Sequence, residues 1–67
     1  MKRWLYIQCE VDKTNEMPPA FSHRFVEADC DDDAYLKGGR FFKLHPSCVA
    51  RENGYKFLND YVIQLRP

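Results

Sequence analysis

Five carboxylates lie within seven consecutive positions of this chain, and no basic residue interrupts them. They are Glu27, Asp29, Asp31, Asp32 and Asp33. Carboxylates stabilise the positive end of a helix, attract basic protein surfaces and bind divalent cations. Three interpretations are therefore open: the capped start of a helix, an acidic patch that docks a basic partner, and a cation site. The cation site would lack the glycine and the terminal glutamate of an EF-hand loop.

A second group of residues that could carry chemistry is His45 with Cys48. Their spacing is compatible with two ligands of a tetrahedral zinc ion. His23, Cys30 and Cys9 are the side chains that would complete such a site, so a zinc-stabilised domain is one hypothesis. The alternative is that the thiols are ordinary buried side chains and that the histidine ends a helix. The sequence offers no third group to orient a Cys–His pair and no glycine-rich phosphate loop. We therefore predict a protein that is not an enzyme and needs no cofactor.

The composition indicates one small folded domain spanning residues 1–67. A hydrophobic share of 45% with 15% aromatic residues is too apolar for a disordered chain. A chain of this size forms a single core of marginal stability. Ten Lys and Arg residues balance ten Asp and Glu residues, which argues against broad nucleic-acid binding. Three cysteines, no apolar signal segment and no long apolar run favour a reducing, cytoplasmic location without membrane insertion.

Three segments predict strands. Residues 4–11 alternate, residues 21–28 are rich in strand-favouring side chains, and residues 55–65 alternate in their last part, in a strand that ends at Pro67. The proline-containing stretch 12–19 breaks regular structure, so we expect the first two strands to pair in antiparallel fashion around it. Residues 47–55 give no clear pattern beyond a turn at their end.

The facing of the strands decides which side chains reach a partner. On the first strand, Leu5, Ile7 and Val11 form the predicted core face, which turns Trp4 and Tyr6 away from it. The second strand leaves two alternatives open. Val26 and Ala28 face the helix if Phe25 and His23 face away. The opposite assignment is nearly as well supported.

Residues 29–45 predict one helix. Asp29 is a suitable N-cap, with Asp32 in the position of a capping box, and basic residues follow toward the C-terminal end. Gly38 and Gly39 oppose the helix unless they allow a close approach to the sheet. One face carries Cys30, Ala34, Gly38, Phe41 and His45, with Tyr35 and Phe42 at its flank and Leu36, Arg40 and Lys43 outside. The predicted fold is α+β: two layers, about three antiparallel strands and one helix, in the order β-β-α-β.

A sheet with one helix leaves one face uncovered, unless residues 12–20 or 47–55 fold over it. With Trp4 and Tyr6 on that face, our first hypothesis is a non-catalytic interaction protein. It would bind a larger host protein, and inhibit or modulate it, through this face and the five acids. A homodimer built face to face is another use of the same surface. The alternative function is a single-stranded nucleic-acid-binding module that uses Trp4, Tyr6, Phe25 and Arg24.

The run Phe-Val-Glu-Ala-Asp-Cys-Asp-Asp-Asp-Ala at residues 25–34, a short helix after it, and a closing strand that ends Leu-Arg-Pro form a recognisable layout. This layout resembles small phage-encoded inhibitors of host RNA polymerase, in which a sheet and one helix present an acidic surface to a basic region of the enzyme. The resemblance covers roughly residues 25–44 and 61–67. It implies a small acidic-patch protein that inhibits or redirects a host factor, a class that includes anti-defence proteins. Residues 12–19 and 47–55 have no counterpart in it.

Overall fold

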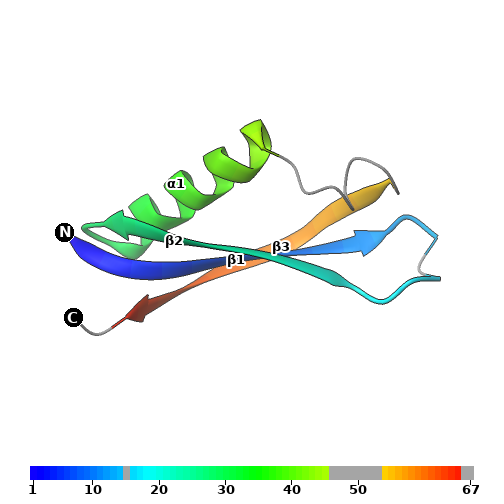
Figure 1. Cartoon of the computed structure of the whole chain (residues 1–67), viewed down its shortest axis with the longest axis horizontal. Helices are drawn as coiled ribbons and strands as arrows, with labels where there is room; N and C mark the ends of the chain where they lie inside the picture. The colour runs from blue at the N-terminus through cyan, green and yellow to red at the C-terminus, as the bar shows by residue number, and fades with distance from the viewer. Residues whose placement is uncertain (15, 46–53, 66–67) are drawn as a thin grey trace.

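The computed structural model describes residues 1–14, 16–45 and 54–65. Its elements follow in the order β1 (Lys2–Asp12), β2 (Ala20–Ala28), α1 (Asp31–Leu44) and β3 (Tyr55–Leu65). The strands form one antiparallel sheet in the order β2-β1-β3, and α1 lies over one of its faces (Figure 1). The predicted α+β fold with β-β-α-β order is therefore confirmed, including the antiparallel pairing of the first two strands.

The register of the sheet determines which side chains share a face. Leu5 of the central strand lies between Phe25 of β2 and Ile63 of β3. A register shift between β1 and β3 after Cys9 interrupts the ladder toward the far end of the sheet. α1 starts beside the end of β2 and rises away from the sheet toward its own C-terminal end (Figure 1). The buried residues of α1 that face the sheet are Ala34 and Gly38.

The core lies between α1 and the sheet. Trp4, Tyr6, Val26, Ala28 and Ala34 are buried there, flanked by the half-buried Tyr35, Phe42 and Val62. Tyr6 is fully buried, and its ring lies against Gly38, where a methyl group would overlap with the ring atoms. The indole N–H of Trp4 donates a hydrogen bond to the carbonyl oxygen of Ala28 at 3.0 Å. The expectation that the glycine pair allows a close approach of helix and sheet is confirmed for Gly38.

The predicted core face of β1 is wrong. Leu5, Ile7 and Val11 are only half-buried, whereas Trp4 and Tyr6 fill the space under the helix. Both faces of this strand are apolar, so alternation alone does not distinguish them. Ala34 of α1 is buried in the same cluster as the two aromatic rings, and Gly38 lies against the Tyr6 ring. On β2, Val26 and Ala28 face the helix, which selects one of the two predicted alternatives.

The helix begins later than predicted. Its N-cap is Cys30 rather than Asp29, and no side chain caps it. The first helical hydrogen bond joins the Ala34 N–H to the Cys30 carbonyl oxygen at 3.1 Å. Cys30 is therefore an exposed residue at the helix start and not the buried core thiol that we expected. Within the described ranges, no helix has the length and apolarity that crossing a membrane requires.

Candidate interaction surface

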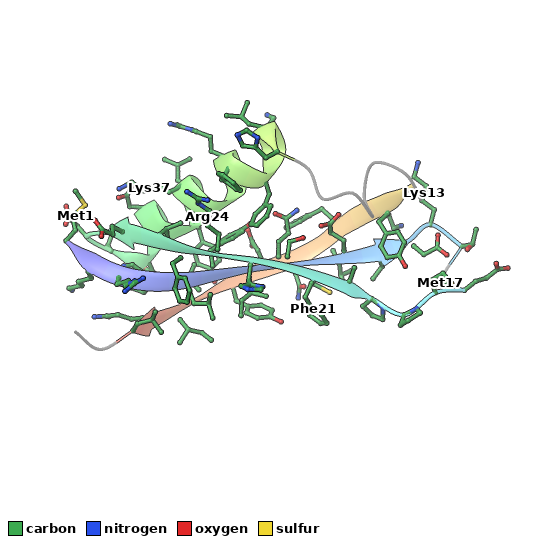
Figure 2. The ribbon with its side chains drawn as sticks, in the orientation of Figure 1. Met1, Lys13, Met17, Phe21, Arg24 and Lys37 are labelled. Atoms are coloured by element: carbon green, nitrogen blue, oxygen red, sulfur yellow. The ribbon has the colours of Figure 1, made fainter. Side chains whose placement is uncertain are left out.

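The face of the sheet opposite α1, here called the open face, carries apolar side chains from all three strands. Alternation and register assign to it Arg3, Leu5, Ile7, Cys9, Phe21, His23, Phe25, Glu27, Asn59, Tyr61, Ile63 and Leu65. Phe21 is 61% exposed, Phe25 52%, Ile63 50% and Tyr61 39%. Cys9 is buried, whereas no element that the structure describes covers these four exposed side chains. Figure 2 shows the side chains that project below the sheet, away from the helix, with Phe21 labelled among them.

The centre of the open face is almost free of charge. Ile7 lies between His23 and Tyr61, next to the row formed by Leu5 and its two partners. Arg3 and Glu27 are opposite one another at one end, where the Arg3 guanidinium lies 5.0 Å from the centroid of the Phe25 ring. Among the residues assigned to this face, Arg3 is the one lysine or arginine, so apolar burial is the interaction that the face offers, rather than contacts with several phosphate groups.

The acidic residues lie beside that charged end. Glu27 belongs to the open face, while Asp29, Asp31 and Asp32 are exposed in the β2–α1 connection and the first turn of the helix. Asp31 accepts a hydrogen bond from the Asp32 N–H at 2.9 Å. Asp33 forms a salt bridge with Lys37, four positions later, at 3.2 Å. Three of the five acids thus lie in the first turn of the helix, but none of them caps it, and the exposed acids extend the rim of the open face.

Two residues predicted for the binding face are not on it. Trp4 and Tyr6 lie beneath α1, so they are not available to a partner. The Tyr6 hydroxyl donates a hydrogen bond to the Asp60 carboxylate at 2.8 Å. Burial, and then this bond, raise the pKa of the Tyr6 hydroxyl well above its ordinary value. Both side chains are structural.

The predicted nucleic-acid platform is also not formed. Of its four residues, Phe25 alone lies on the open face. Trp4 and Tyr6 are buried, and the guanidinium of Arg24 lies on the helix side of the sheet, 3.8 Å from the centroid of the Phe41 ring. No continuous set of aromatic and basic side chains joins these four positions.

The candidate zinc ligands are dispersed in the structure. Cys9 and His23 belong to the open face, Cys30 occupies the N-cap position of α1 and His45 follows its end. Cys48 lies outside the described residues. Among those that the structure does describe, no three His, Cys, Asp or Glu side chains come together in a way that would hold a metal ion.

Sequence reasoning missed Phe21, Tyr61 and Ile63 as members of the exposed surface. Their pattern was visible as alternation within each strand, but alternation gives no absolute facing. The pairing register supplies the missing information, because residues that pair across strands share one face.

Comparisons with known proteins add no relative to this description. No protein-family model matches the chain, and neither the curated proteins nor the solved structures contain a significant match.

Proposed function

We propose that this protein is a non-catalytic interaction protein that binds a larger protein through the open face and thereby inhibits or modulates it. The observation that carries this proposal is the exposure of four large apolar side chains on one sheet face: Phe21, Phe25, Tyr61 and Ile63. Isolated exposed hydrophobic residues are common, whereas a contiguous apolar patch of this kind is typical of an interaction site.

The energetics favour an occupied open face. Full burial of a large apolar side chain contributes about 1.5–3 kcal/mol relative to full exposure. Each of the four residues retains 39% or more of its exposure, so a partner gains a substantial part of that free energy at each position. A domain of 67 residues has a small core of its own, and a bound partner would stabilise it further.

The rim indicates what the partner looks like. Glu27, Asp29, Asp31 and Asp32 add negative charge at one end of the open face. A complementary surface has an apolar centre and basic side chains at one border, since charged rims steer association and apolar centres supply affinity. A larger host protein with an apolar surface beside a basic region meets both requirements.

Site-specific photo-crosslinking in extracts of the producing cells tests this proposal. Benzoylphenylalanine replaces Tyr61 on the open face, and the control carries it in place of Leu36, an exposed residue on the outer side of α1. We expect one larger protein to be crosslinked from position 61 and not from position 36. Equal crosslinking from both positions, or none from position 61, would contradict the proposal.

The acidic rim has its own test in the same assay. Replacing Asp29, Asp31 and Asp32 by asparagine removes three exposed charges. We expect less crosslinking at low salt and little change at high salt, because salt screens exposed charges. Crosslinks that join two copies of this chain, with no larger protein, would instead indicate a homodimer.

A further inference from the structure

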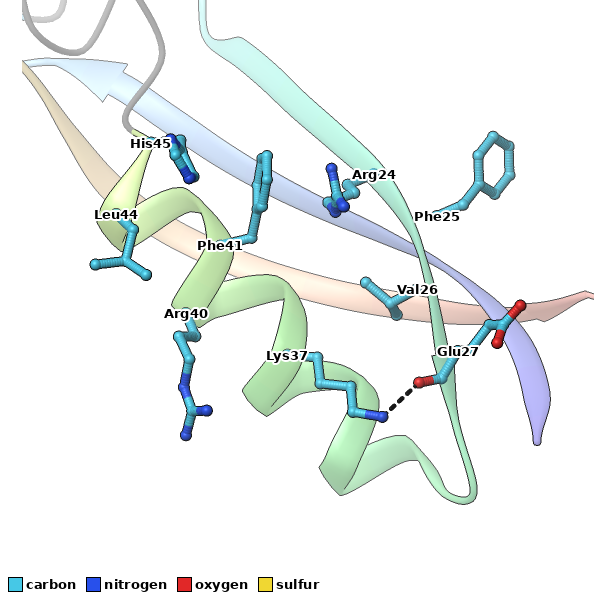
Figure 3. Close-up of a pocket in the computed structure, with 9 residues that line it drawn as sticks. All are labelled: Arg24, Phe25, Val26, Glu27, Lys37, Arg40, Phe41, Leu44 and His45. Carbon is cyan, nitrogen blue, oxygen red and sulfur yellow. Dashed lines mark hydrogen bonds between the residues drawn. The ribbon is translucent and has the colours of Figure 1, made fainter.

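A groove separates the outer edge of β2 from α1, on the side of the sheet opposite the open face. It has a volume of about 490 Å³, and its lining includes Arg24, Val26, Lys37, Arg40, Phe41 and His45 (Figure 3). The groove forms because α1 rises away from the sheet along its length. The lining combines apolar side chains with three lysine or arginine residues and one acidic residue, Glu27.

Three planar groups lie side by side along this groove, with the guanidinium of Arg24 over the ring of Phe41 and the imidazole of His45 tilted against that ring. The Arg24 guanidinium lies 3.8 Å from the centroid of the Phe41 ring. The imidazole of His45 lies 4.8 Å from the same ring at an interplanar angle of 39°. Figure 3 shows the phenylalanine ring between the other two groups. This arrangement holds the guanidinium in place, while its N–H donors remain at the edge of the plane for an anionic ligand.

The charge of the groove is positive although the whole chain is neutral. Among the described residues, neither Arg24 nor Arg40 forms a salt bridge, whereas Lys37 is paired with Asp33. The ammonium group of Lys37 also donates a hydrogen bond to the Glu27 carbonyl oxygen at 2.7 Å. The two arginines are therefore the cations that a carboxylate can neutralise.

The neighbouring strand adds a second feature. β2 lies at an edge of the sheet and pairs with β1 on one side only. Edge strands present backbone N–H and C=O groups without a strand partner, and extended peptides bind proteins by adding to such edges. An extended ligand can thus form backbone hydrogen bonds with β2 while its side chains enter the groove.

We propose that this groove binds an extended acidic peptide segment of another protein, which adds to the edge of β2 and places carboxylates on Arg24 and Arg40. A single-stranded nucleic acid fits less well, because base stacking needs a free aromatic face. Arg24 and His45 flank the Phe41 ring. The groove shares Phe25 and Glu27 with the border of the open face, but its two arginines belong to the helix side and to α1, so this proposal does not rest on the proposed function.

The test uses the full chain and a blocked heptapeptide, acetyl-Glu-Val-Glu-Leu-Glu-Val-Glu-amide, followed by amide NMR. Binding should shift the resonances of β2 and of the C-terminal half of α1, and leave those of β3 unchanged. The same peptide with lysine in place of glutamate should not bind. We expect R24Q/R40Q to weaken the affinity by about tenfold or more, because it removes two charge-assisted contacts.

Matched variants keep the test decisive. Lys13→Gln removes one positive charge, as Arg40→Gln does, but at the exposed β1–β2 turn. It should leave the affinity unchanged. Arg40→Gln alone changes an exposed residue of α1, so a reduced affinity in this variant cannot be ascribed to unfolding. Absence of binding, equal binding of the lysine peptide, or shifts confined to the open face would overturn the proposal. Displacement of the peptide by oligothymidylate would overturn it in favour of a nucleic acid.

Discussion

On the central strand, Trp4 and Tyr6 are buried beneath α1, whereas their neighbours Leu5 and Ile7 point to the other side of the sheet and remain half-buried. Both faces of β1 are apolar, but only one of them is covered by the helix. The covered face carries the two aromatic rings that are buried with Ala34 and Gly38. The open face carries exposed side chains that no described element covers. A domain with one helix can complete one face of its sheet, and the other face is available for a partner.

The two adjacent glycines provide the largest expected contrast within the covered face. Gly38→Ala should lower the free energy of unfolding by about 3 kcal/mol, because its methyl group overlaps with the Tyr6 ring. Gly39→Ala should raise it by up to about 1 kcal/mol, because the added methyl group has room and alanine favours the helix. Urea denaturation followed by the fluorescence of Trp4 measures both. Equal destabilisation would show that helix and sheet are not in close contact at Gly38.

A pair of neighbouring residues on β2 compares the two faces directly. Val26→Ala should lower the free energy of unfolding by about 2 kcal/mol, because Val26 is buried under α1. Phe25→Ala should change it by less than about 1 kcal/mol, because that ring is half exposed on the open face. The second substitution should instead reduce binding of a hydrophobic dye such as ANS. A larger loss of stability for Phe25→Ala would reverse our assignment of the faces.

The buried hydroxyl of Tyr6 makes the covered face sensitive to alkaline pH. Tyr6→Phe removes the hydrogen bond to Asp60 and should lower the free energy of unfolding by about 1–2 kcal/mol at neutral pH. Burial raises the pKa of this hydroxyl in the folded state, so its contribution is present below about pH 10 and is lost as the pH rises further. The decline in stability above that pH should be smaller in the variant. Identical alkaline profiles would contradict the assignment.

The smallest predicted effect lies outside both faces, at the start of the β1–β2 connection. The Thr14 hydroxyl donates a hydrogen bond to Asp12 at 2.7 Å, which lowers the pKa of that carboxyl. Its contribution to stability is therefore present above the ordinary aspartate pKa and is lost as the pH falls. Thr14→Val should weaken this acid dependence slightly, and Thr14→Ser should preserve it. Acid titration followed by circular dichroism compares the two variants.

The sequence alone determined the elements and their order. Alternation near the C-terminal end predicted the third strand, which the structure places at Tyr55–Leu65, and acids before bases predicted a helix within one or two residues of its observed ends. These features follow from local rules, since backbone preferences and helix-end charges act over a few residues. The paired glycines are compatible with a helix here if they allow a close helix–sheet contact, and Gly38 makes that contact.

Only the tertiary structure decided which face of the sheet is covered, and therefore which residues belong to the candidate site. Trp4 and Tyr6 are the core residues of β1, where Leu5 and Ile7 were predicted. Arg24 lies beside α1 and not on the predicted platform. Alternation along a strand is symmetric between its two faces. It therefore predicts which residues share a face but not which face meets the helix. That choice depends on how ring volume fits the space beside Gly38, a contact between residues far apart in the chain.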